Sequence, residues 1–87
     1  MTDVADERLG PPGLEAVERV STTDHVLRAL RTAIVSGSVR QGEQLREVQL
    51  AASLGTGRGP VREALRQLVQ EGLAQHEVHR GIFVRHI

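Results

Sequence analysis

Three arginines stand four residues apart in the second half of the chain, at Arg58, Arg62 and Arg66. Residues at this spacing share one side of an α-helix, so we expect the three guanidinium groups to form a stripe along a helix. A guanidinium group donates parallel hydrogen bonds that match a phosphate or the edge of a guanine. The stripe therefore predicts binding in a groove of duplex DNA, and the alternative is an ordinary solvated helix face.

The helix that must carry these arginines is expected from Arg58 to Gln70 or Glu71. Pro60 falls in its first turn, where no intrahelical hydrogen bond is lost, and Gly72 closes its C-terminal end. Four apolar residues at helical spacing give the same helix a side for burial: Val61, Ala64, Leu65 and Leu68. A helix with a buried side next to an arginine side suits docking in a nucleic-acid groove.

A shorter helix is expected just upstream, over Glu47–Leu54. Glu47 lies in its first turn, where a carboxylate meets the positive end of the helix dipole. Its apolar residues, which we expect to be buried, are Val48, Leu50, Ala51 and Leu54. Gly55–Gly57 makes the turn into the arginine helix, so the two helices form a helix-turn-helix, the simplest DNA-reading unit.

Another helix is expected to precede this pair, over residues 23–36. Thr22, Thr23 or Asp24 can cap its start with a side-chain oxygen, and Gly37 can close its end in the left-handed conformation. Its apolar residues recur at helical spacing: Val26, Leu27, Leu30, Ala33 and Ile34.

Two short strands are expected after the arginine helix, at Leu73–Glu77 and Ile82–Arg85 around a Val78–Gly81 turn. A further extended piece is expected at Gln44–Arg46, in the connector between the first two helices. The order of three helices and a hairpin predicts a mainly α fold with a small β-hairpin, the winged helix-turn-helix.

Composition and charge agree with one small domain behind a separate leader. The chain has 87 residues and zero formal net charge, but residues 1–20 hold five acids and two arginines, while residues 21–87 hold nine arginines and six acids. We therefore expect a flexible acidic leader over residues 1–20 and a basic domain over residues 21–87. Every basic residue is arginine, which suits DNA contacts and equally fits a genome with arginine-rich codon usage.

Several classes of protein are disfavoured by what the sequence does not contain. There is no cysteine and no apolar run of the roughly 20 residues that a membrane helix needs, so we expect a cytoplasmic protein that does not engage a membrane. No phosphate loop, nucleophile elbow or cofactor fingerprint is present, and Glu63 and Glu71 lie on expected helix surfaces. His76 and His79 are three apart on a hairpin and point to opposite faces. We expect no enzyme activity, no cofactor and no metal site.

Residues typical of one known family are spread between Val26 and Val84. They are Ile34, Gly37, Gly42, Leu45, Glu47, Leu50-Ala51, Leu54-Gly55, Arg58-Gly59-Pro60-Val61-Arg62-Glu63-Ala64-Leu65, Leu68, Glu71-Gly72-Leu73, Arg80-Gly81 and Val84. This run resembles the N-terminal DNA-binding domain of GntR-type bacterial transcription regulators. The PVREAL segment followed by L-x-x-E-G-L most resembles the branch of that family whose effector domain is all-helical.

The resemblance implies a sequence-specific transcription regulator that binds double-stranded DNA. In that family, arginines at the positions of Arg58 and Arg62 read the major groove, and the wing tip, here Arg80-Gly81, approaches the minor groove. Family members bind a short pseudo-palindrome as dimers, so we expect a homodimer on DNA. The alternative is a protein-interaction module, because winged helices also serve as docking surfaces.

Six further positions are candidate DNA contacts, two of them weaker than the rest. Arg66 is expected to meet phosphate or solvent, Arg46 the DNA backbone, and His79 a phosphate or a groove. Surface arginines are common, so Arg28 and the neighbouring Arg31 are weaker candidates for backbone contacts. Gly81 is either a plain hairpin glycine or one whose missing side chain lets the wing approach a groove.

The sequence departs from the family pattern in three ways. Gly57 and Gly59 occupy positions where the family has Ser or Thr, whose hydroxyls cap the recognition helix and contact phosphate, and Val48 stands where some relatives have a DNA-contacting arginine. We expect the glycine at the cap to weaken the helix start by a few tenths of a kcal/mol, and Gly59 by up to about 1 kcal/mol. The third departure is that the sequence ends at Ile87, before an effector domain, so we expect no small-molecule effector to bind this chain.

Overall fold

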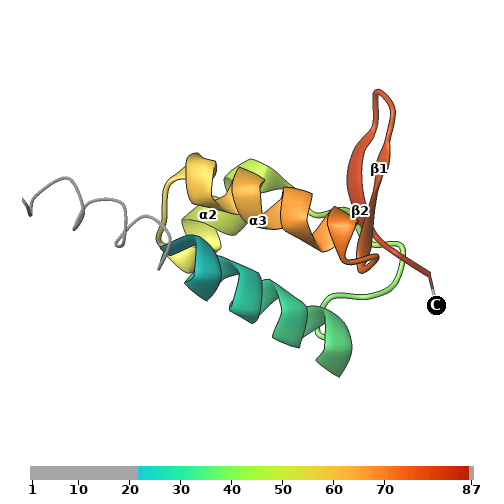
Figure 1. The fold of residues 1–87 in the computed structure, drawn as a ribbon, viewed down its shortest axis with the longest axis horizontal. Helices are drawn as coiled ribbons and strands as arrows, with labels where there is room; N and C mark the ends of the chain where they lie inside the picture. Colours follow the sequence, from blue (N-terminus) through green and yellow to red (C-terminus); the bar gives the residue numbers. More distant parts are fainter. Residues whose placement is uncertain (1–21, 87) are drawn as a thin grey trace, which may run out of the picture.

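Three helices and a two-stranded hairpin follow one another along the described part of the chain (Figure 1). The structure is a computed structural model and describes residues 22–86. A first helix covers residues 22–36 and is followed by α2 (Glu47–Leu54), α3 (Arg58–Gln70), β1 (Ala74–Glu77) and β2 (Gly81–Val84). This order confirms the predicted winged helix-turn-helix. The leader expected over residues 1–20 lies outside the described residues.

The first helix ends as predicted, but its start is not where the sequence placed it. Gly37 has a φ of +85° and donates its backbone N–H to the Ile34 carbonyl at 3.2 Å, which closes the helix. Thr22, Thr23 and Asp24, the expected caps, are already helical. Thr22 is the first described residue, so the start of this helix is not described.

The bounds of α2 and α3 are those predicted, and glycine conformation explains the turn between them. Gly55 has a φ of +68° and donates its N–H toward the carbonyls of Ala51 and Ala52, which ends α2. Gly57 is the N-cap of α3, with extended backbone and no side-chain cap hydrogen bond. The helix start thus lacks the hydroxyl cap, as its glycine requires.

The hairpin is one residue shorter at each outer end than predicted. Its register pairs Ala74 with Val84 and Glu77 with Gly81, so Gly81 opens β2 instead of closing the turn. The three-residue turn is closed by the Arg80 N–H, which donates to the Glu77 carbonyl at 2.9 Å.

The connector before α2 adds a third extended piece to the hairpin, as predicted for Gln44. Gln44 forms an isolated antiparallel bridge with Phe83 of β2. The Leu45 N–H donates to the Ile82 carbonyl, and the Val84 N–H donates to the Glu43 carbonyl, each at 2.8 Å. The hairpin of β1 and β2 is the wing of this fold. It is therefore tied to the start of α2 as well as to the end of α3.

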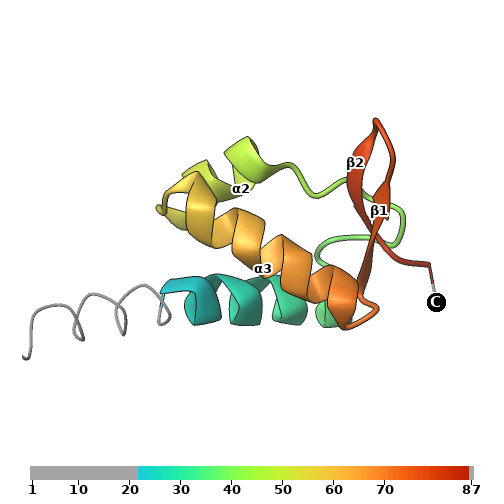
Figure 2. The ribbon, with the colours of Figure 1, turned by 45° about the horizontal axis from the view of Figure 1, so that its top comes forward.

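The core lies where α3 meets the other elements. Figure 2 shows α3 between α2 and the first helix, with the hairpin beyond its C-terminal end. The buried apolar residues are Val26, Leu27, Leu30, Leu45, Ala51, Val61, Ala64, Leu65, Leu68, Ala74 and Val84. All four residues predicted for the buried side of α3 are among them. None of the described helices is both long enough and apolar enough to span a lipid bilayer.

The predicted burial of α2 is wrong for two of its residues. Val48 is 59% exposed and Leu54 is 37% exposed, whereas Ala51 is buried. Val48 borders a groove between α2 and the hairpin, and Leu54 is the last residue of α2. A helix of eight residues meets its neighbours along one narrow side, so apolar residues away from that side stay in solvent.

Candidate nucleic-acid interface

The exposed side of α3 carries the three arginines that the sequence singled out. Arg58, Arg62 and Arg66 are all exposed, while the opposite side of the helix is buried in the core. A helix of this kind is anchored by its apolar side and leaves its arginine side free to meet a partner. The structure thus brings the predicted stripe together on one helix.

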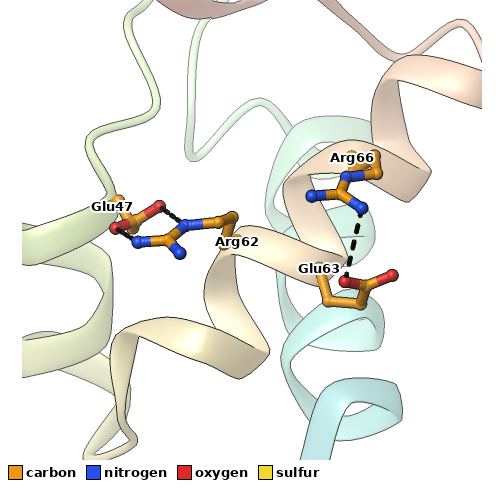
Figure 3. Close-up of polar contacts among 4 residues, drawn as sticks. All are labelled: Glu47, Arg62, Glu63 and Arg66. Atoms are coloured by element: carbon orange, nitrogen blue, oxygen red, sulfur yellow. Dashed lines mark hydrogen bonds and ion pairs between the residues drawn. The ribbon is translucent and has the colours of Figure 1, made fainter.

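Arg62 is held by a carboxylate from the neighbouring helix (Figure 3). Its Nε donates to Glu47 Oε2 at 2.9 Å and its Nη2 donates to Glu47 Oε1 at 3.1 Å. Hydrogen bonds to the charged form lower the pKa of the Glu47 carboxyl and raise the pKa of the Arg62 guanidinium. Sequence reasoning gave Glu47 only a helix-dipole role, because no local spacing relates residues 15 apart.

Arg66 has a looser partner on its own helix. Its Nη1 lies 3.8 Å from Glu63 Oε1, and both side chains are more than half exposed. Figure 3 shows this single contact beside the bidentate contact between Arg62 and Glu47. An exposed pair of this geometry contributes little to stability and leaves Arg66 free to turn toward another partner.

Arg58 and Arg46 are exposed and lie near the turn and the start of α2. Among the described residues, neither makes a side-chain hydrogen bond or an ion pair within 4 Å. Arg46 is the N-cap of α2, and its side chain does not cap the helix. No described residue therefore occupies either guanidinium group.

Arg80, in the turn of the wing, contacts two side chains of the hairpin. Arg80 Nη1 lies 2.8 Å from Glu77 Oε1, and the guanidinium carbon stands 5.1 Å from the centroid of the Phe83 ring. Gln44 Nε2 donates to the Arg80 carbonyl at 3.0 Å. His79, at the turn, has a φ of +64°. Sequence reasoning found Arg80 and His79 but missed Glu77 and Gln44, which fix the turn.

A groove of about 600 Å³ lies between the start of α2 and the hairpin. The groove is lined by Glu47 and Val48 of α2, by Arg46 just before α2, and by His76 and Gly81 of the strands. The candidate contacts of α2, the partner of Arg62 and the wing glycine therefore border one concave region. No three Cys, His, Asp or Glu side chains within residues 22–86 gather closely enough to ligate a metal ion.

Arg31 has a structural role that its spacing did not predict. It donates from Nε and Nη2 to the two carboxylate oxygens of Glu71, at 3.2 and 2.7 Å, and this hydrogen bonding raises the pKa of its guanidinium. The contact ties the first helix to the C-terminal end of α3. Arg28 is exposed, and no other described residue hydrogen-bonds to its side chain.

We expect alanine substitutions at two of the site glycines to change stability in opposite directions. A Cβ at Gly59 meets nothing within 4 Å, so Gly59→Ala should stabilise α3 by up to about 1 kcal/mol through helix propensity. Gly81 has a φ of +119°, and a Cβ there would lie 2.7 Å from Gln44 Nε2. Gly81→Ala should therefore destabilise the domain by about 1 kcal/mol or more. Urea unfolding of both variants measures the two changes in the free energy of unfolding. Changes of the same sign would contradict the prediction.

The ion pair between Glu47 and Arg62 also predicts how the Glu47 carboxyl titrates. The Glu47 carboxyl should have a pKa below the ordinary 4.5, because Arg62 donates to its charged form. The stabilisation is then fully present above the unfolded pKa and is lost as pH falls through the lower folded pKa. Carbon-13 NMR of the carboxyl measures the midpoint, which should rise toward the ordinary value in Arg62→Ala. An unchanged midpoint in that variant would assign the shift to another cause.

Comparisons with known proteins agree with this geometry. The family described as bacterial regulatory proteins, gntR family, matches residues 22–84. The chain is 36% identical over 69 residues to a protein of Paenarthrobacter nicotinovorans described as a probable D-xylose utilization operon transcriptional repressor, covering 79% of this chain and 30% of that protein. It is 45% identical over 51 residues to the Nta operon transcriptional regulator of Aminobacter aminovorans, covering 59% and 24%.

A solved structure shows the same fold. The crystal structure of a GntR-family transcriptional regulator from Pseudomonas syringae pv. tomato str. DC3000 matches with a TM-score of 0.70 and 41% identity, over 76% of this chain and 28% of that one. The chain spans less than a third of each of these three proteins. The chain belongs to the GntR family of bacterial transcription regulators, and it carries that family's DNA-binding winged helix-turn-helix.

Proposed function

We propose that this chain recognises a specific operator sequence by placing α3 in the major groove and the wing beside the minor groove. The observation that carries this proposal is the exposed arginine side of α3 above a fully buried apolar side. The start of α2 and the wing border one groove, which supports a shared DNA-facing region. Helix-turn-helix proteins dock their second helix in the major groove with its N-terminal residues on the bases.

Within this proposal the arginines have different tasks. Arg58 and Arg62 lie in the first two turns of α3 and contact base edges, most naturally the O6 and N7 atoms of guanine. Arg66, one turn further, and Arg46, at the start of α2, contact phosphates. Gly57 and Gly59 have no side chains and let the start of α3 approach the DNA backbone closely.

The wing adds contacts at the edge of the site. Arg80 lies at the turn, where Gln44 supports its backbone, and it enters or borders the minor groove. His79 contacts a phosphate or the same groove. Gly81 keeps this part of the wing narrow, because it carries no side chain and has a φ that favours glycine.

We further propose that two copies bind together on a pseudo-palindrome in the cytoplasm. One copy offers few base contacts, so its affinity alone should lie near the nonspecific range of about 10⁻⁴ to 10⁻⁶ M at physiological salt. A second copy on an inverted half-site supplies the missing contacts. Relatives named for a D-xylose utilization operon and an Nta operon suggest that the target is the control region of an operon.

Selection of bound duplexes from random DNA tests this proposal. We expect an inverted repeat to be enriched, two chains to bind each duplex, and affinity to fall steeply as salt rises, because arginines release condensed cations from the phosphates. No enriched sequence together with no salt dependence would reject DNA recognition. That outcome would favour a protein partner on this surface instead.

A further inference from the structure

The Glu47 carboxylate leaves one edge of the Arg62 guanidinium unused. A guanidinium group has five N–H donors, and Glu47 takes one from Nε and one from Nη2. The remaining donors are the two on Nη1 and the second on Nη2. No other described residue accepts a hydrogen bond from them, and Figure 3 marks no contact from Nη1 to the other residues drawn. This free edge is the end of the group, with two parallel donors.

The pair is asymmetric in its exposure. The Glu47 side chain is 26% exposed, while that of Arg62 is 59% exposed. The carboxylate, on the first residue of α2, is therefore the more sheltered partner, and the guanidinium is the more exposed one. Each partner belongs to a helix packed against the other, so the pair depends on the α2–α3 packing and not on one flexible turn.

The other arginines of α3 are not held in this way. Arg66 has one contact of 3.8 Å to an exposed Glu63, and Arg58 makes no ion pair within 4 Å with a described residue. Among contacts between described residues, Arg62 is thus the one arginine of the stripe with a bidentate partner. Since the same face carries all three arginines, a general need to neutralise charge would not explain why this one is held from the neighbouring helix.

We propose that Glu47 is a positioning residue that fixes Arg62 so that its free edge is presented to a guanine. This inference rests on the proposed role of Arg62 in reading the operator. Guanine accepts two parallel hydrogen bonds at O6 and N7, which match the unused Nη1 and Nη2 donors. An arginine already held in one conformation loses less side-chain freedom on binding than a mobile one.

The same carboxylate acts against nonspecific binding. Its negative charge stands beside Arg62 and repels a phosphate that approaches the pair from the side. A freely moving Arg62 would instead follow phosphates on any sequence, because phosphate contacts carry no sequence information. Glu47 therefore raises specific affinity and lowers nonspecific affinity, and both effects increase the ratio between them.

The test compares Glu47→Gln with Glu63→Gln on two DNA duplexes. The probes are the inverted repeat selected by the wild-type chain and a scrambled duplex of the same length and composition. Glu47→Gln should weaken binding to the selected duplex by about 2- to 10-fold, the cost of immobilising one side chain, and strengthen binding to the scrambled one. Glu63→Gln removes the same charge from α3, where Glu63 has only the 3.8 Å contact with Arg66, so no bidentate pair is broken. It should change both affinities by the same factor.

A double-mutant cycle separates this inference from the proposal on which it rests. In the Arg62→Ala background, Glu47→Gln should no longer change the ratio of the two affinities. If Arg62→Ala itself leaves binding to the selected duplex unchanged, the proposed reading role of Arg62 fails. If Arg62→Ala weakens that binding but Glu47→Gln strengthens both duplexes equally, or leaves the ratio unchanged, only the positioning role of Glu47 is overturned.

Folding is controlled in the same experiment. Melting temperatures of all variants are measured first, and binding is compared well below the lowest of them, so that each chain is folded. A Glu47 that serves stability alone would lower the melting temperature of Glu47→Gln without altering the ratio of affinities in the folded chain. That result counts against the inference.

Discussion

Replacing Arg62 with alanine should weaken binding to the selected operator by roughly 1–3 kcal/mol, or about 5- to 150-fold, and relax base choice at one position in each half-site. If Arg62 reads a base as proposed, the variant loses a bidentate base contact, and it also leaves the Glu47 carboxylate without its cation. Fluorescence anisotropy with the selected duplex and with duplexes changed at single positions measures both effects.

The matched comparison is Arg66→Ala, one turn further along the same helix. A phosphate contact carries no sequence information, so this variant should weaken the selected and scrambled duplexes alike and reduce the salt slope by about 1. If Arg62→Ala gives this uniform pattern, or leaves affinity unchanged, the base contact belongs to another residue.

The largest loss of stability is expected from Leu68→Ala. Leu68 is 0% exposed on the buried side of α3 and is among the largest fully buried side chains of the described core. Removing it should lower the free energy of unfolding by about 2–5 kcal/mol, the sum of lost burial and the cavity left behind. A domain of this size has only about 5–15 kcal/mol in total, so part of the population should be unfolded at modest denaturant concentrations.

Leu54→Ala makes the same chemical change where the side chain is 37% exposed, at the last residue of α2. We expect it to cost less than about 1 kcal/mol. Urea unfolding followed by circular dichroism compares the two variants. Equal losses would mean that α3 does not bury Leu68 as the structure shows.

The bounds of α2 and α3 could be predicted from the sequence because the residues that start and end these helices lie next to them in the chain. Gly55 can adopt the left-handed conformation that ends a helix, and Pro60 is tolerated only near a helix start. The buried side of α3 follows from a single period of 3.6 residues over a helix of 13 residues. Val48 and Leu54 of α2 could not be assigned in this way, because periodicity does not say which neighbours cover a short helix.

The partners of the candidate site were beyond sequence reasoning for a different reason. Glu47 reaches Arg62 across 15 residues, and Gln44 reaches Arg80 across 36. Spacing rules predict neighbours only within a turn of one helix or across one hairpin. Candidate DNA contacts could thus be proposed from the sequence, whereas the groups that hold Arg62 and Arg80 depend on how α2, α3 and the connector pack.

The bridge between Gln44 and Phe83 has a consequence for the order in which the chain folds. It joins two segments that are separated by all of α2 and α3, so forming it in an otherwise open chain would cost the entropy of closing a long loop. The two helices make nearer contacts along the chain and can pack first, which brings the connector and β2 together. The wing should then be added after the folding barrier has been crossed. Substitutions that loosen it should speed unfolding and leave the folding rate nearly unchanged.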